Sequence, residues 1–404
     1  MTSGLRPVRL LTEISHIEWL AERLGGEPRI AVDLESDGFY VYHEKICLLQ
    51  ISSEKEDFIL DPLSARDISP LAVIFRDPAV EKVFHAAEYD IISLKRDFGF
   101  KVRGVFDTMA AARALGKPKL GLAGLIEEYF GIVLSKKLQR ANWGKRPLSE
   151  EQIQYARLDT HYLLRLRDKL EVELKERKLQ EEARDAFRKV ERVEPSQKSF
   201  DPESYWRLAG ARELSPQGLA VLRELYFYRE RTAASLDRAP FRVLPEPLLV
   251  RLAAELPRTL DGLPRVHGMT PYLFEHHSRE LLECIARGLR AQPVEKLPQH
   301  PVRGEWDGAT SRRYEALRAW RKKTALERGV EPVVILETDE MKALAAAPSK
   351  SEDPSDWLAS LSTFKAEAYR ADLLRMLKET GPSAKPRHRR RGTPPIKPLG
   401  RSLP

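Results

Sequence analysis

The strongest constraint on the fold is a short apolar run that ends in acids, IAVDLESDG at residues 30–38. Such a run is typical of a buried strand, yet it contains Asp33, Glu35 and Asp37. Strand side chains alternate between two faces, so Asp33 and Glu35 lie on one face, about 6 to 7 Å apart along the chain. The run is therefore either a strand that ends in a solvated acidic turn, or part of a site whose divalent cation cancels the repulsion between the carboxylates.

Short apolar or alternating segments around this run predict the strands of one sheet. These segments are 30–34, 46–52, 57–60 and 82–84. Helical periodicity follows them, and the predicted helices cover 88–98, 107–115, 120–130 and 149–178. This order of strands and helices indicates an α/β domain of roughly 190 residues.

Beyond this domain the chain is helical in character and repeats itself. Residues 190–206 are polar and contain proline and serine, so they are expected to form a linker. After the linker, residues 227–257 align with residues 319–348 at a constant offset of 92, which pairs Tyr228 with Trp320. Repetition at a fixed spacing predicts two copies of one small helical domain.

Three further residues favour the cation site over the acidic turn. Tyr155 and Asp159 are four residues apart in a predicted helix and share one of its faces, and Asp90 falls in the first turn of another helix. Taken singly, each residue has an ordinary explanation. Tyr155 can be a packed tyrosine and Asp159 a solvated acid of an amphipathic helix, and Asp90 can be a favourable charge at a helix N-terminus. Together with Asp33 and Glu35 they supply four carboxylates, which suit two divalent ions about 4 Å apart in a phosphodiester-hydrolysing site.

The chemistry of these side chains suggests their roles. Oxygen ligands without a cysteine or histidine cluster favour Mg²⁺ or Mn²⁺ over zinc. A tyrosine has a reference pKa near 10, which makes Tyr155 a poor general base at pH 7. Tyr155 is therefore expected to orient the attacking water by a hydrogen bond.

The motifs D-x-E, H-x-x-E-Y-D and Y-x-x-x-D, in this order, resemble the DEDD exonuclease superfamily in its subgroup with tyrosine in the third motif, and within it the ribonuclease D family. The resemblance implies a ribonuclease H-like α/β fold and two Mg²⁺ or Mn²⁺ ions as cofactors. It also implies that Asp33, Glu35, Asp90 and Asp159 are metal ligands, and that these acids and Tyr155 are the catalytic residues.

The two helical copies are similar to HRDC domains, the nucleic-acid-binding modules of helicases and ribonuclease D. The expected architecture is thus an α/β exonuclease domain followed by two small all-α HRDC-like domains. The expected boundaries are 1–192 for the exonuclease domain, 205–292 for the first HRDC-like domain, 306–380 for a diverged second one, and 381–404 for a disordered basic tail.

The net charge of +8 comes almost entirely from that tail. Residues 1–200 hold 33 basic and 33 acidic residues, whereas residues 381–404 hold seven basic residues and no acidic one. Such a tail can contact a phosphate backbone without sequence preference. The charge therefore says little about the folded domains.

A second basic segment lies inside the α/β domain, at residues 135–147. An aromatic residue among bases suits a single strand with a stacked base, so five residues are candidates for nucleic-acid binding. They are Lys136, Lys137, Arg140, Trp143 and Arg146. A solvated loop with Trp143 plugged into the core is the alternative, and the sequence does not choose between them.

Other features bear on the compartment and on further sites. Cys47 and Cys284 are the only cysteines, so both are expected to be buried rather than part of a disulfide framework. His276 and His277 have no third ligand near them and are expected on the surface. The chain has no apolar run near 18 residues and its first residues lack a signal-peptide core, which predicts a cytoplasmic protein without a membrane partner.

The motifs and the resemblance together predict a 3′-5′ exoribonuclease that releases nucleoside 5′-monophosphates from the 3′ ends of single-stranded RNA. The resemblance implies tRNA precursors and other stable RNAs as substrates. A Werner-type 3′-5′ DNA exonuclease and an inactive RNA-binding adaptor remain as alternatives. The presence of all four acids and Tyr155 counts against the adaptor, and the lack of a G-x-x-x-x-G-K-[ST] loop excludes a helicase.

Overall fold

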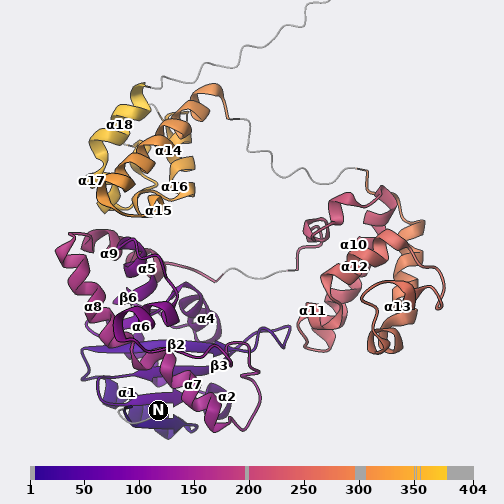
Figure 1. Ribbon diagram of the computed structural model, residues 1–404, viewed down its shortest axis with the longest axis horizontal. Coiled ribbons are helices and arrows are strands. Elements are labelled where there is room, and N and C mark those ends of the chain that lie inside the picture. The colour runs from indigo at the N-terminus through magenta and orange to yellow at the C-terminus, as the bar shows by residue number, and fades with distance from the viewer. Residues whose placement is uncertain are drawn as a thin grey trace, which may run out of the picture. The chain divides into compact units, whose positions relative to one another are not determined.

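The structure is a computed structural model that describes residues 5–195, 200–295, 306–349, 351, 353–354 and 356–379. Its contacts divide the chain into two compact units, Met1–Pro301 and Val302–Pro404. The first unit holds an α/β domain and a helical domain with separate cores, and the second unit is helical (Figure 1). The domain limits expected from the sequence stay a prediction, and the expected disordered tail lies outside the described residues.

One mixed sheet of six strands forms the centre of the α/β domain, in the order β1-β4-β3-β2-β5-β6 (Figure 1). β3 is antiparallel to β2 and β4, and the other neighbours are parallel. The strands are β1 Val8–Leu11, β2 Arg29–Ser36, β3 Ile46–Ser52, β4 Asp57–Leu60, β5 Glu81–Phe84 and β6 Val105–Asp107. The four predicted strands are confirmed, whereas β1 and β6 were missed.

Helices cover both faces of this sheet. They are α1 Ile14–Leu24, α2 Pro62–Ala65, α3 Ala72–Arg76, α4 Glu88–Phe98, α5 Thr108–Ala114, α6 Leu122–Phe130, α7 Glu150–His161, α8 Leu163–Glu176 and α9 Gln180–Glu191. On one face, Val32 and Ile51 join a core with side chains of α1 and α4. On the other face, α7 packs on β2, β3 and β4. Every residue of β3 is buried, as expected for a strand with both faces covered.

The predicted helix 149–178 begins as expected but is two helices. Ser149 accepts a hydrogen bond from the backbone N–H of Gln152 at 3.2 Å, and the Gln152 side chain accepts one from Ser149, which completes a capping box. The helix breaks at Tyr162, between α7 and α8. Apolar spacing continues across the break, because leucines 163, 166, 170 and 174 are all buried in α8, so periodicity alone concealed it.

The two helical domains confirm the predicted repeat element by element. The first contains α10 Pro216–Ser235, α11 Pro240–Val243, α12 Glu246–Glu255 and α13 Pro271–Arg290, and the second contains α14 Gly308–Arg328, α15 Pro332–Ile335, α16 Thr338–Ala346, α17 Thr363–Ala368 and α18 Arg370–Glu379. α11, α12 and α13 begin 92 residues before α15, α16 and α17. The same offset relates two aromatic contacts, Tyr228 with His277 and Trp320 with Tyr369.

Several smaller predictions can be checked here. Cys47 and Cys284 are buried, as expected. The prediction that His277 lies on the surface is wrong, because His277 is 7% exposed and Tyr228 Oη lies 2.7 Å from its Nδ1, whereas His276 is exposed. Within the described residues, every helix is too short or too polar to span a lipid bilayer.

Candidate active site

The four predicted acids come from three elements of the α/β domain. β2 pairs with β5 only over Arg29–Ala31 and continues beyond it beside β3, so Asp33 and Glu35 stand where β2 and β5 part. Asp90 lies in the first turn of α4, which follows β5. Asp159 and Tyr155 lie in α7, which packs on β2 and β3. Asp37, the third acid of the opening run, instead accepts a hydrogen bond from Lys45 N at 3.0 Å and stabilises the turn after β2.

Electrostatics shows that these carboxyls influence one another. Burial raises the pKa of Asp33 to about 7. Burial, and then the charges of Asp33, Asp159 and Asp90, raise the pKa of Glu35 to about 10. Burial and the charge of Asp33 also raise the pKa of Asp90 and of Asp159 well above the usual range. Asp33 is thus the common neighbour of the other three acids, and the ionised cluster is costly without a counterion.

Tyr155 belongs to the same cluster. Burial, followed by the charges of Asp159, Glu35 and Asp33, raises its pKa above the ordinary value for tyrosine. Its hydroxyl therefore stays protonated at neutral pH and can donate a hydrogen bond, which the predicted role in orienting water requires; that role stays a prediction. The ring of Trp143 lies 6.0 Å from the ring of Tyr155, centroid to centroid, and supports it from the side.

The donor set fits divalent metal ions by its chemistry. Four carboxyls supply only oxygen ligands, which Mg²⁺ and Mn²⁺ prefer, and their mutual repulsion is what bound cations would relieve. Among the described residues, no three acidic, histidine or cysteine side chains stand close enough together to form a ready-made ion site.

A buried network that the sequence did not reveal fixes α7 on the sheet. Asp57 of β4 is fully buried, and its Oδ2 accepts hydrogen bonds from His161 Nδ1 at 2.7 Å and from Arg157 Nη2 at 2.9 Å. Its Oδ1 accepts one from Ser52 Oγ at 2.7 Å, and Ser52 Oγ also lies 2.7 Å from Thr160 Oγ1. These bonds hold the helix that carries Tyr155 and Asp159.

A second missed residue, Asp107, holds the turn before α4. Its two carboxylate oxygens accept hydrogen bonds from the backbone N–H groups of Ala86 and Ala87, each at 3.0 Å. Ala86 has φ of +62°, a left-handed conformation that is unfavourable for a residue with a Cβ. Asp107 thus stabilises the turn that orients Asp90. His85, the first residue of the H-x-x-E-Y-D motif, lies 2.9 Å from Thr108 Oγ1 through its Nδ1.

The basic segment 135–147 contains both surface and structural residues. Of the two interpretations left open for Trp143, packing in the core is the correct one, because its side chain is 1% exposed and belongs to a buried cluster; Trp143 is therefore withdrawn as a candidate for nucleic-acid binding. Arg146 is also structural: its Nε and Nη2 donate to Asp61 at 2.6 and 2.7 Å, and Nη2 donates to the Cys47 carbonyl at 2.8 Å. Lys136, Lys137 and Arg140 are exposed, and Lys137 pairs with Glu151 at 2.8 Å.

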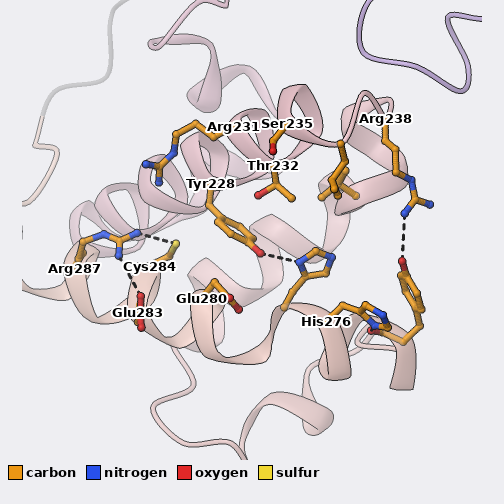
Figure 2. Close-up of a pocket in the computed structure, with 14 residues that line it drawn as sticks. Tyr228, Arg231, Thr232, Ser235, Arg238, His276, Glu280, Glu283, Cys284 and Arg287 are labelled. Atoms are coloured by element: carbon orange, nitrogen blue, oxygen red, sulfur yellow. Dashed lines mark hydrogen bonds and ion pairs between the residues drawn. The ribbon is translucent and has the colours of Figure 1, made fainter.

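A cavity of about 540 Å³ lies in the first helical domain, lined mainly by α10 and α13 (Figure 2). Tyr272 and His276 stack at one side of it, 4.2 Å apart, and Arg238 Nη1 donates to Tyr272 Oη at 3.2 Å. Arg287 is held by Glu224 at 3.0 Å. Arg231 also lines the cavity and makes no ion pair with any described residue, so it can receive an anion.

Comparison with known proteins follows the same division of the chain. The exosome complex exonuclease RRP6 of Saccharomyces cerevisiae is 35% identical over 292 residues, which cover 68% of this chain and 40% of that protein. The solved catalytic core of RRP6 from Trypanosoma brucei is similar with a TM-score of 0.66 and 29% identity, over 72% of this chain and 82% of the other. Escherichia coli RNase D is similar with a TM-score of 0.63 and 27% identity, over 92% and 99% of the two chains.

Domain families give the same result. Residues 8–175 match the 3′-5′ exonuclease family, and residues 218–285 and 311–377 both match the HRDC domain. The fold and the acidic cluster thus define a DEDD-type 3′-5′ exonuclease domain followed by HRDC domains. The chain belongs to the ribonuclease D family. It spans less than two thirds of the length of the curated relatives that it matches.

Proposed function

We propose that this protein is a 3′-5′ exoribonuclease that removes nucleoside 5′-monophosphates from RNA 3′ ends with two divalent metal ions, Mg²⁺ or Mn²⁺. One observation carries the proposal: Asp33 influences the ionisation of Glu35, Asp90, Asp159 and Tyr155, which come from a strand and two helices. Acids that repel one another and are held by packed strands and helices are suited to bind divalent cations. The bound cations would in turn attract the phosphodiester.

Asp33, Glu35, Asp90 and Asp159 would hold the two ions. When bound, the ions would supply activation of the attacking water and stabilisation of the leaving 3′ oxygen. Tyr155 donates a hydrogen bond that orients the attacking water, since its raised pKa keeps the hydroxyl protonated. Trp143 and the Asp57 network keep this tyrosine and Asp159 in place.

RNA would be held by surfaces outside the acidic cluster. Lys136 and Arg140 are exposed in the exonuclease domain and can contact the phosphate backbone. In the first HRDC domain, Arg231 can receive a phosphate, while the stacked pair of Tyr272 and His276 offers an aromatic surface to a base. At the same offset of 92, the second copy replaces Arg238 with Val330 and Arg287 with Glu379, so we assign RNA binding mainly to the first copy.

The proposed substrates are the 3′ ends of stable RNAs, with tRNA precursors among them. Two similar proteins support an RNA substrate, since RNase D of Escherichia coli is described as an exoribonuclease involved in structured RNA processing and the yeast relative as an exosome complex exonuclease. A Werner-type DNA exonuclease shares the acidic site, so the choice between RNA and DNA requires a direct comparison.

The test is digestion of matched 5′-labelled single-stranded RNA and DNA oligonucleotides by the purified chain, with Mn²⁺, with Mg²⁺ or with a chelator. We expect a ladder of products shortened from the 3′ end on RNA, which is lost with the chelator and in Asp33→Ala. A ladder of equal intensity on DNA would favour the DNA exonuclease. RNA binding without shortening would favour the adaptor.

A further inference from the structure

Gln50 lies on the face of the sheet that carries the acidic cluster. In the antiparallel pairing of β2 with β3 it is directly opposite Asp33, and on its other side it is opposite Ile59 of β4. Directly opposed residues of an antiparallel pair project to the same face of the sheet, with their Cβ atoms close together. Gln50 therefore shares a face with Asp33 and is its immediate neighbour across the strands.

The neighbours of Gln50 show that α7 covers this position. Two residues further along β3, Ser52 Oγ lies 2.7 Å from Thr160 Oγ1 of α7. Two residues earlier, Leu48 belongs to the same buried cluster as Ala156 of α7. The Gln50 side chain thus lies beneath the turn of α7 that runs from Ala156 to Thr160, and this turn contains Asp159.

The amide of Gln50 is buried without a hydrogen-bond partner. The residue is fully buried, and neither Oε1 nor Nε2 is paired with any group in the described part of the chain. An unpaired buried amide costs free energy, which a leucine or methionine of similar size would avoid. Buried polar groups in native proteins are generally satisfied, so an exception requires an explanation.

We propose that Gln50 is a positioning residue of the active site: when a divalent cation binds, the free Nε2–H of Gln50 donates to the Asp33 carboxylate and orients it toward that cation. A carboxylate has about four acceptor positions, so Asp33 can accept this hydrogen bond and still coordinate an ion. Gln50 acts through Asp33 and does not touch the substrate. The proposal rests on the proposed function, because it assumes that Asp33 is a metal ligand.

Hydrogen bonds to a ligating carboxylate typically change metal affinity by a factor of about 10 to 100. The experiment measures Mn²⁺ binding to the metal-free full chain by calorimetric titration, together with its melting temperature with and without Mn²⁺. Gln50→Met removes the amide with little change in volume, and Gln50→Asn keeps the amide but withdraws it by one methylene. Ile51→Val is the matched control, because Ile51 is buried in β3 on the opposite face.

We expect Gln50→Met to bind Mn²⁺ about 10 to 100 times more weakly than wild type, Gln50→Asn to be intermediate, and Ile51→Val to match wild type. The metal-free melting temperature of Gln50→Met should not fall below that of the wild type. Unchanged Mn²⁺ affinity in Gln50→Met would overturn the proposal. So would a drop in its metal-free melting temperature larger than that of Ile51→Val, since the amide would then be structural.

Failure of the proposed function gives a different result. If wild type binds Mn²⁺ but shortens no RNA, the exonuclease proposal fails, and the affinities of the Gln50 variants still decide the role of Gln50. If Asp33→Ala binds Mn²⁺ as well as wild type does, Asp33 is not a ligand and the Gln50 proposal fails with it.

Discussion

The Nδ1 of His161 lies 2.7 Å from a carboxylate oxygen of Asp57, in a fully buried contact between α7 and β4. Burial alone would raise the pKa of Asp57, but hydrogen bonds from His161 and Ser52 outweigh it and lower the pKa below the usual value. The ionised carboxylate is therefore the form that stabilises the fold. It also holds the helix that carries two of the proposed catalytic residues.

Asp57→Asn should destabilise the protein by about 3 kcal/mol at pH 7, since it removes the charge that satisfies buried donors. Because the folded pKa lies below the unfolded one, this contribution is present above about pH 4 and is lost as the pH falls further. Urea unfolding at pH 7 and pH 3 should show a smaller difference between wild type and variant at pH 3. An equal difference at both pH values would contradict this account of Asp57.

Asp33→Asn should have the opposite effect on the metal-free protein. The folded pKa of Asp33, about 7, lies above the unfolded value of about 4, so its ionisation lowers stability as the pH rises between these values. Removing the charge should stabilise the metal-free protein by about 1 to 3 kcal/mol at pH 8. Thermal denaturation at pH 8 should also show that added Mn²⁺ stabilises wild type and not the variant. A metal-free variant less stable than wild type would exclude repulsion as the dominant effect.

Tyr155→Phe should slow RNA hydrolysis by roughly 10²-fold while leaving Mn²⁺ affinity unchanged, because the hydroxyl orients water and is not a metal ligand. The phenylalanine ring preserves the contact with Trp143. Single-turnover digestion at saturating Mn²⁺, beside a calorimetric Mn²⁺ titration, separates the two effects. Parallel losses of rate and Mn²⁺ affinity would make Tyr155 a ligand instead.

Arg146→Ala and Arg140→Ala should differ although both arginines lie in one basic segment. Arg146 is bound to Asp61 and to three backbone carbonyls, so its loss should cost about 2 to 3 kcal/mol of stability and leave RNA affinity intact. Arg140 is exposed, so its loss should weaken RNA binding without changing the melting temperature. Fluorescence anisotropy and thermal denaturation of both variants check this. Weaker RNA binding by a well-folded Arg146→Ala would reverse the assignment.

Arg231→Glu should weaken RNA binding by roughly tenfold. It should also reduce the magnitude of the slope of log affinity against log salt concentration by about one, because one phosphate contact is lost. Lys323→Glu is the matched control, because Lys323 occupies the same position in the second HRDC domain and already faces Glu327 at 3.8 Å. We expect it to bind RNA like wild type. RNA affinities of both variants, measured at several salt concentrations, check this prediction. An equal loss of affinity in both variants would refute the assignment of RNA binding mainly to the first HRDC domain.

The sequence predicted those parts of the molecule that local patterns encode. The four central strands, the start of a helix at Ser149 and the duplicated helical domain each follow from spacing along the chain. The candidate acids were found because Asp33 and Glu35 share a strand face and Tyr155 and Asp159 share a helix face. In each case the relevant residues are neighbours along the chain.

The missed features depend on residues far apart in the sequence. Asp57 and His161 are separated by 104 positions, and nothing local to either indicates the contact. Asp107 looks like an ordinary helix cap, and its second role at Ala86 appears only when β5 and β6 lie side by side. Trp143 in a basic loop had two equally good interpretations until the core showed that its ring is buried.

α7 has two functional sides, since Tyr155 and Asp159 serve the acidic cluster while Arg157, Thr160 and His161 bind the sheet or its residues. Each residue added to a helix turns everything beyond it by about 100°. A single insertion near Gln154 would therefore turn the later residues of α7 relative to the sheet and misplace both sets at once. The length of α7 from Tyr155 to His161 is therefore fixed by the two tasks that this helix performs.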